Sequence, residues 1–354
     1  MRKFLNLVCV FALAVGFSAC EKEKPEPPAP DMIVYINDGP EVKYFLSDLG
    51  SLFTEPVTKL VFGEGAKISG NDIKAIRDQY AALEYIDMTK ATIFGLGYND
   101  TYYGNTTTTY VVGGNMFYNM KKLKTVLLPI NTISIGTAAF RGCSSLTSIT
   151  IPEGVTKIGM ETFQECTSLA SINFGAQVQE IGVRAFQECT SLVSITLPPL
   201  LTTISYSLFH TCTSLNSVII PPSVTTINDE AFWYCRSLTS LTFPAGVTVI
   251  GKEILAISAV QTLNLQSTTP PELRKEGSFS LAFAWADLMT INIPKEAAAA
   301  YNTVLNNQSK GWEHTTTGAI NLVPGGSVAV KELAGFGFSG SEIFEFTISA
   351  ILDL

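Results

Sequence analysis

One pattern, Phe-x-x-Cys-x-Ser-Leu, returns five times along the chain at a fixed interval of 23 residues, first at Phe140 and last at Phe232. No residue is inserted or deleted between these copies. Weaker copies flank them, because Met120 replaces the cysteine one unit earlier and Ser258 replaces it one unit later. Self-similarity at such a period is typical of a solenoid, in which each repeat is one coil stacked on the next.

Each unit keeps one order of apolar residues, which in the first full copy are Leu146, Ile149, Ile151, Val155, Ile158 and Phe163. The alternation from Ile149 to Ile151 predicts a very short strand, and Pro152 ends it because proline cannot donate to a strand ladder. One coil is too small to bury its own apolar side chains. Stacked coils bury them between neighbours about 4.8 Å apart, so the sequence predicts a β-rich solenoid.

The unit resembles the BspA-like class of leucine-rich repeats, and the resemblance extends over about residues 117–260. It departs from the family pattern at Gly175, Ser205 and Asn228, which fall in turns. The resemblance implies a leucine-rich-repeat solenoid of right-handed stacked coils. It also implies a cell-surface protein that binds host proteins, matrix proteins or other microbes. The matching positions in the first copy are Leu146, Ile149, Ile151, Pro152, Val155, Ile158, Gly159, Phe163 and Cys166.

Residues 1–19 have the pattern of a secretory signal peptide, with Arg2 and Lys3 before an apolar run too short to span a bilayer stably. The run ends in small residues and Cys20, as at a bacterial lipoprotein cleavage site, so we expect Cys20 to be lipidated. An ordinary signal peptide with an incidental cysteine is the alternative. Residues 20–31 are rich in Pro, Glu and Lys and form a tether that cannot pack. We therefore expect a lipid-anchored protein of the outer membrane, exposed at the cell surface.

Irregular segments flank the repeats of residues 117–266. Residues 32–116 are predicted to form an N-terminal cap and residues 267–312 a C-terminal cap. Residues 313–354 match no known pattern, although their alternation and their glycines allow short strands. The expected elements are strands at 57–62, 83–88, 263–265 and 291–293, a helix that opens at Ser69 and runs to about Tyr80, a helix at 295–305, and loops at 95–115 and 267–280.

Composition and charge argue against several classes of partner and chemistry. The formal net charge is −8, only 15% of the residues are charged and no basic cluster is present, so we expect no nucleic-acid binding. The two histidines, His210 and His314, lie in no catalytic or metal-binding motif, and His210 is expected to be a solvated surface residue. We interpret Glu165 and Glu188, one unit apart, as a solvated face and not as a glycosidase pair. The sequence predicts no enzyme activity, no metal and no cofactor.

The cysteines of the repeats form a single column with one member in each coil. They lack the Cys-x-x-Cys pairing that zinc sites use. A free cysteine behaves as a small buried hydrophobe, so we interpret the column as structural. Disulfides between coils are the alternative. The column comprises Cys143, Cys166, Cys189, Cys212 and Cys235.

The outward positions of the predicted strands form two columns of small, uncharged residues. Alternate residues of a strand point to opposite sides, so these positions flank the buried one. Such a surface could contact a glycan or a protein strand, although Ser and Thr also suit an exposed strand that binds nothing. One column comprises Ser148, Ser171, Ser194, Ser217 and Ser240, and the other comprises Thr150, Asn173, Thr196, Ile219 and Thr242.

A second candidate patch is formed by Trp233 and Tyr234, beside His210, where other copies carry polar residues. Exposed aromatic rings are favoured in binding hot spots; packing under the degenerate next coil is the alternative. These features favour a non-catalytic adhesion or protein-binding scaffold for an extracellular protein or glycan ligand. The second hypothesis is a glycan-capture lipoprotein of a nutrient uptake system. It would need aromatic platforms for sugar rings, and only Trp233 is a candidate in the repeats.

Overall fold

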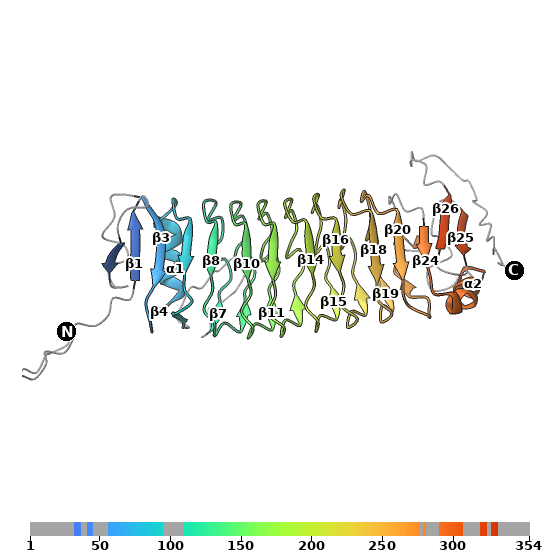
Figure 1. Cartoon of the computed structure of the whole chain (residues 1–354), viewed down its shortest axis with the longest axis horizontal. Coiled ribbons are helices and arrows are strands. Elements are labelled where there is room, and N and C mark those ends of the chain that lie inside the picture. Colours follow the sequence, from blue (N-terminus) through green and yellow to red (C-terminus); the bar gives the residue numbers. More distant parts are fainter. Residues whose placement is uncertain are drawn as a thin grey trace, which may run out of the picture.

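The computed structural model describes residues 32–36, 41–44, 56–94, 110–276, 279–280, 290–306, 319–323 and 327–331. They form one elongated solenoid whose coils are stacked along its long axis, with cap elements at both ends (Figure 1). The fold class expected from the repeat is therefore confirmed. The predicted signal peptide, Cys20 and the tether lie outside the described residues, as does the segment 95–109.

The first strand of each coil belongs to a row that we call sheet one. The row is hydrogen-bonded as four separate sheets. Where neighbouring strands of the row pair, they are parallel and in register, so that Ile149 faces Ile172 and Ile195 faces Val218. Register is fixed by the apolar residue at the centre of each strand, since a slip by one residue would turn it to solvent. Sheet one comprises β3 (Val57–Phe62), β5 (Tyr85–Asp87), β8 (Thr125–Leu127), β10 (Ser148–Thr150), β12 (Ser171–Asn173), β14 (Ser194–Thr196), β16 (Ser217–Ile219), β18 (Ser240–Phe243), β20 (Thr262–Leu265) and β24 (Thr290–Asn292).

A second, shorter strand follows the first in the coils. These strands form a second row, hydrogen-bonded as three separate sheets, which we call sheet two. Ile158 lies opposite both Ile135 and Ile181 in parallel register. The sequence does not predict these strands, because two residues are too few to show an alternating pattern. The loops expected at 95–115 and 267–280 are wrong in part, since residues 111–112 pair with β9 and residues 272–273 pair with β19. Sheet two comprises β4 (Lys67–Ile68), β6 (Thr92–Ile93), β7 (Val111–Val112), β9 (Ser134–Ile135), β11 (Lys157–Ile158), β13 (Glu180–Ile181), β15 (Thr203–Ile204), β17 (Thr226–Ile227), β19 (Val249–Ile250) and β21 (Glu272–Leu273).

The third side of each coil is a turn segment that is hydrogen-bonded to the next coil without forming a strand. Phe163 N donates to Ala185 O at 2.8 Å, and Glu165 N donates to Gln187 O at 2.9 Å. Each segment contains two residues with positive φ, as at Glu161 (φ 56°) and Glu165 (φ 62°). We call the surface formed by residues 137–142, 160–165, 183–188, 206–211 and 229–234 the turn face.

One column of positive φ includes two β-branched residues, Thr211 (φ 62°) and Ile257 (φ 54°), at the position that Gly142 (φ 73°) fills in an earlier coil. A left-handed conformation destabilises an L-residue by roughly 1–2 kcal/mol, and it is least suited to β-branched side chains. Because Ile257 is 43% exposed, we expect Ile257→Gly to raise the free energy of unfolding by about 1 kcal/mol in urea denaturation. The control Ile219→Gly, on the extended strand β16, should lower it. Equal losses in both variants would contradict strain at residue 257.

A stack of phenylalanine rings runs along the interior of the repeats. Neighbouring ring centroids lie 4.9–5.7 Å apart, and the ring planes are within 16° of parallel. All six side chains are fully buried. The 23-residue spacing places one ring in each coil, so the core predicted from the repeat is confirmed. The stack comprises Phe117, Phe140, Phe163, Phe186, Phe209 and Phe232.

The N-terminal cap closes one end of sheet one. Strand β1 (Met32–Ile36) pairs antiparallel with β3, and β2 (Glu41–Tyr44) pairs antiparallel with β1. Helix α1 (Gly70–Gln79) begins at Ser69, whose hydroxyl accepts from Asp72 N, and Asp72 in turn accepts from Ser69 N. This reciprocal capping satisfies two amide groups that the first helical turn leaves free. The helix expected after Ser69 is confirmed.

The C-terminal cap closes the other end with a hairpin and a helix. The helical part consists of η2 (Lys295–Ala297) and α2 (Ala298–Asn306), where the sequence predicted a helix. Strands β25 (Ala319–Val323) and β26 (Ser327–Lys331) are the short strands that residues 313–354 allowed, and β26 pairs antiparallel with β24. A small antiparallel pair, β22 (Lys275–Glu276) and β23 (Phe279–Ser280), precedes them. Among the described residues, hairpins thus cover the two end strands of sheet one, β3 and β24, against edge pairing.

Candidate binding faces

The predicted columns of small residues lie on the outer side of sheet one. In β10, β12 and β14 the central residue is buried and the residues on either side are exposed, as sequence periodicity predicts. We call this surface the hydroxyl face. It continues toward the C-terminal cap, where Asn264 Nδ2 donates to Thr242 Oγ1 at 3.2 Å. The hydroxyl face comprises Ser148, Thr150, Ser171, Asn173, Ser194, Thr196, Ser217, Ile219, Ser240 and Thr242.

The hydroxyl face carries no charged residue among these positions. Its one large apolar member is Ile219, which is 59% exposed. Ser and Thr offer a donor and an acceptor on each hydroxyl, so a partner can form hydrogen bonds at every coil. The face can therefore bind a polar ligand that runs along the solenoid, and it contains no acid–base pair for catalysis.

The aromatic patch is less exposed than expected. Trp233 and Tyr234 lie on the turn face and are half-buried, so the expectation of exposed rings is wrong in part. The ring of Trp233 packs at 84° to that of His210, with centroids 4.4 Å apart. Arg236 covers the ring of Tyr234 at 4.2 Å from its centroid. These are contacts between individual side chains, and the spacing of the repeat alone does not predict them.

His210 is also more buried than expected. Its ring is half-buried, and its Nδ1 lies 2.8 Å from Thr211 Oγ1. Burial lowers the pKa of His210 and outweighs the opposing influence of Glu230 and Glu188. The ring is consequently neutral near pH 7.

The five repeat cysteines are free thiols buried in the interior. Each Sγ donates to the backbone oxygen of the phenylalanine 26 residues earlier, as Cys189 does to Phe163 O at 3.2 Å. Burial raises the pKa of all five, that of Cys143 to about 12. Among the described residues no group of three or more His, Cys, Asp or Glu side chains could hold a metal ion. The thiols therefore fill the core and satisfy a buried carbonyl in the preceding coil.

This environment predicts unreactive cysteines, because the thiolate is the reactive form and burial disfavours it. We expect none of Cys143, Cys166, Cys189, Cys212 and Cys235 to react with a mild thiol reagent in the folded protein. All five should react after denaturation. Mass spectrometry of the labelled protein measures the number modified. Rapid labelling of any repeat cysteine under native conditions would contradict the buried column.

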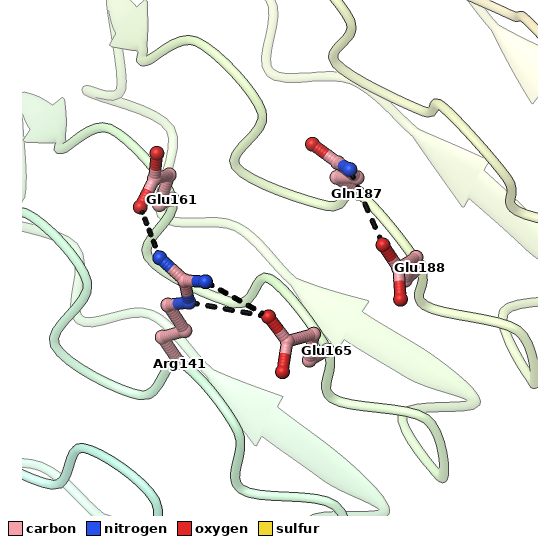
Figure 2. A network of polar contacts seen from close by, with 5 residues as sticks. All are labelled: Arg141, Glu161, Glu165, Gln187 and Glu188. Carbon is pink, nitrogen blue, oxygen red and sulfur yellow. Dashed lines mark hydrogen bonds and ion pairs between the residues drawn. The ribbon is translucent and has the colours of Figure 1, made fainter.

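A polar network lies on the turn face (Figure 2). Arg141 donates to Glu161 at 2.7 Å and to Glu165 at 3.0 Å. Burial opposes the charge of Arg141, but its hydrogen bond to Glu165 and the charges of both carboxylates raise its pKa overall. Gln187 Nε2 donates to Glu188 at 3.2 Å. Glu165 is thus held by an arginine and Glu188 by an amide.

None of the described helices combines the length and the apolar character needed to cross a membrane. The sequence profile described as BspA type Leucine rich repeat region (6 copies) matches residues 110–238 and 184–310. The chain belongs to this family. The BspA-type profile covers the phenylalanine stack and the cysteine column, and it reaches into the C-terminal cap. Among curated proteins no sequence matches the chain.

Three solved structures show what this chain resembles. A leucine rich repeat protein of T. pallidum is 32% identical over 39% of this chain and 67% of its own, with a TM-score of 0.35. A leucine-rich repeat protein of Bacteroides ovatus is 19% identical over 74% and 68%, with a TM-score of 0.42. A leucine rich cell surface protein of Faecalibacterium prausnitzii is 23% identical over 74% and 71%, with a TM-score of 0.42.

Proposed function

We propose that this BspA-type protein is a non-catalytic, lipid-anchored scaffold of the cell surface that binds an extracellular protein through its hydroxyl face. The observation that most supports this proposal is a regular, uncharged row of hydroxyl and amide groups exposed along sheet one. A solenoid offers such a row as one long surface, which suits an extended partner. The cell surface location named for the Faecalibacterium prausnitzii protein agrees with the lipoprotein signal at Cys20.

Binding is tested with the full-length protein against a panel of matrix proteins and a glycan array. Ser171→Arg with Ser194→Arg places two long cations on the hydroxyl face and should abolish binding to the ligand found. The matched control is Gln179→Arg with Thr202→Arg, which changes the charge equally at two exposed positions off that face. A ligand that binds the first double variant as well as the wild type would refute the hydroxyl face. A ligand set consisting only of glycans would favour the glycan-capture lipoprotein.

The anchor has its own prediction. Changing Cys20 to serine removes the sulfur that would carry the lipid, so we expect the protein to leave the membrane fraction. Covalent lipid can be followed with a radiolabelled fatty acid, and the wild type should incorporate it whereas the variant should not. An added protease should reach the wild type on intact cells. A wild type that takes up no fatty acid, or full protection from the protease, would contradict a lipid anchor or surface exposure, respectively.

A further inference from the structure

We propose that the turn face is a second binding surface, and that it binds a cationic segment of a protein partner. It differs in kind from the hydroxyl face, because its residues are charged and aromatic. The turn face carries five carboxylates against two guanidinium groups, whereas residues 117–260 as a whole contain equal numbers of acidic and basic residues. Negative charge is thus gathered on this side of the repeats. The carboxylates belong to Glu161, Glu165, Glu188, Asp229 and Glu230, and the guanidinium groups to Arg141 and Arg184.

Two of these carboxylates have no cationic partner among the described contacts. Glu188 accepts from the amide of Gln187, and Glu230 accepts from Ser207 Oγ at 2.8 Å. His210 does not supply the missing charge near pH 7, because burial keeps its ring neutral. The guanidinium of Arg184 lies over the ring of Tyr206, 5.1 Å from its centroid. Glu188 and Glu230 are therefore open to a cation from outside.

Two side-chain amide oxygens on the same face accept no hydrogen bond. The Oε1 atoms of Gln164 and Gln187 have no hydrogen-bond partner, and Gln164 is only 7% exposed. Both residues occupy the position of Arg141 in successive coils. Both oxygens are buried, and because the terminal torsion of glutamine is soft, each can meet a donor of a bound segment once the amide turns outward. Ammonium, guanidinium and backbone N–H groups are the donors that such a face would accept.

The aromatic residues fit the same partner. Half-buried Tyr206 and Trp233 offer ring surface to lysine and arginine side chains. Trp, Tyr and Arg are the residues most enriched in binding hot spots, whereas Ser is depleted in interfaces. On this ground the turn face is suited to hold a protein partner in addition to the one proposed for the hydroxyl face.

The spacing of the two open carboxylates suggests the pattern of the partner. Glu188 and Glu230 lie on coils two steps apart, which is about 10 Å along the solenoid axis. In the polyproline II conformation, which has three residues per turn and a rise of about 3.1 Å, residues three positions apart lie on one side of the chain and about 9 Å apart. A segment with lysine or arginine at every third position can therefore reach both carboxylates at once.

The probe is the labelled heptapeptide Lys-Gly-Gly-Lys-Gly-Gly-Lys, added to the full-length protein at low ionic strength and followed by fluorescence anisotropy. Glu188→Gln with Glu230→Gln should weaken binding by about fivefold or more, since two exposed ion pairs are lost and the side chains keep their shape. The control, Glu153→Gln with Glu180→Gln, removes the same charge from exposed positions off the turn face and should bind the peptide nearly as the wild type does. Physiological salt should weaken binding to the wild type.

Equal weakening in the two double variants would overturn the proposal, because it would reduce binding to overall charge. Equal binding of the same peptide with Glu in place of Lys would overturn it too. Preference for a neutral hexasaccharide such as cellohexaose, lost in the Glu188 and Glu230 variant, would make the turn face a glycan site instead. The inference is separable from the proposed function, since Ser171→Arg with Ser194→Arg should leave peptide binding in place.

Discussion

Replacing Phe186 with alanine is expected to lower the free energy of unfolding by about 3–5 kcal/mol, the usual loss when an aromatic ring is removed from a packed core. Its side chain is completely buried. The ring stacks between those of Phe163 and Phe209, with centroids 5.5 Å and 5.7 Å away. Phe174 packs edge-on against it at 6.1 Å. Stiff coils on either side cannot collapse onto the cavity, so we expect the upper part of the range.

The loss should also be local, because each coil contacts only its neighbours. Hydrogen exchange should accelerate first in residues 163–212, the coils on both sides of Phe186. Phe174→Ala is the matched control, since that ring is only partly buried and its removal should have a smaller effect in denaturation. Unchanged exchange in residues 163–212, or an equal loss from Phe174→Ala, would contradict the stacking of one ring per coil.

The repeat made the core predictable. Residues 23 positions apart must occupy equivalent places in stacked coils, so Phe186 and Cys189 could be assigned to the interior from spacing alone. The strand at Ile195 followed from its alternation of apolar and polar residues. The second strand of the coil could not be predicted, because two residues, Thr203 and Ile204, are too few to show a period. The backbone bonds between turn segments, which depend on positive φ at residues such as Glu165, leave no pattern of hydrophobicity either.

The candidate faces were only partly predictable. Outward positions such as Ser194 follow from strand periodicity and need no knowledge of neighbours. The burial of Trp233 depends on how His210 of the preceding coil packs against it. This contact depends on the two particular side chains, and the repeat pattern does not predict it. The open carboxylates were missed for the same reason. Arg141 has the same chemistry whether or not it reaches Glu161, and only the structure shows which glutamates it neutralises.

The caps were predictable where local rules govern and obscure where long-range pairing does. The start of α1 at Ser69 depends on capping within one helical turn, so the four residues 69–72 sufficed to predict it. By contrast, β26 pairs antiparallel with β24 across the intervening cap, at Thr290 and Ala329. Antiparallel pairing of distant segments obeys no fixed interval, so the repeat says nothing about it.

Replacing Cys189 with aspartate should destabilise the protein by about 4 kcal/mol or more at pH 7. The thiol is fully buried and donates a hydrogen bond to Phe163 O, so a carboxyl there would face a carbonyl and apolar side chains. Such a site admits the neutral acid far better than the anion. Holding a proton on a group whose usual pKa is about 3.9 accounts for roughly 4 kcal/mol at neutral pH. Cys189→Ala deletes one small buried group and should lose only about 1 kcal/mol.

The dependence on pH separates this electrostatic loss from a packing defect. In the aspartate variant the folded state holds its proton to a higher pH than the unfolded chain does. Its stability is therefore best below about pH 4, the unfolded pKa, and falls as pH rises toward neutrality. The alanine variant has no such group, so the difference between the two should shrink on acidification in urea denaturation at matched pH. A difference independent of pH would make the loss a packing defect and contradict the electrostatic explanation. Stoichiometric zinc in the wild type, or ligand binding lost in a folded Cys189→Ala protein, would show that the column serves a site and not the core.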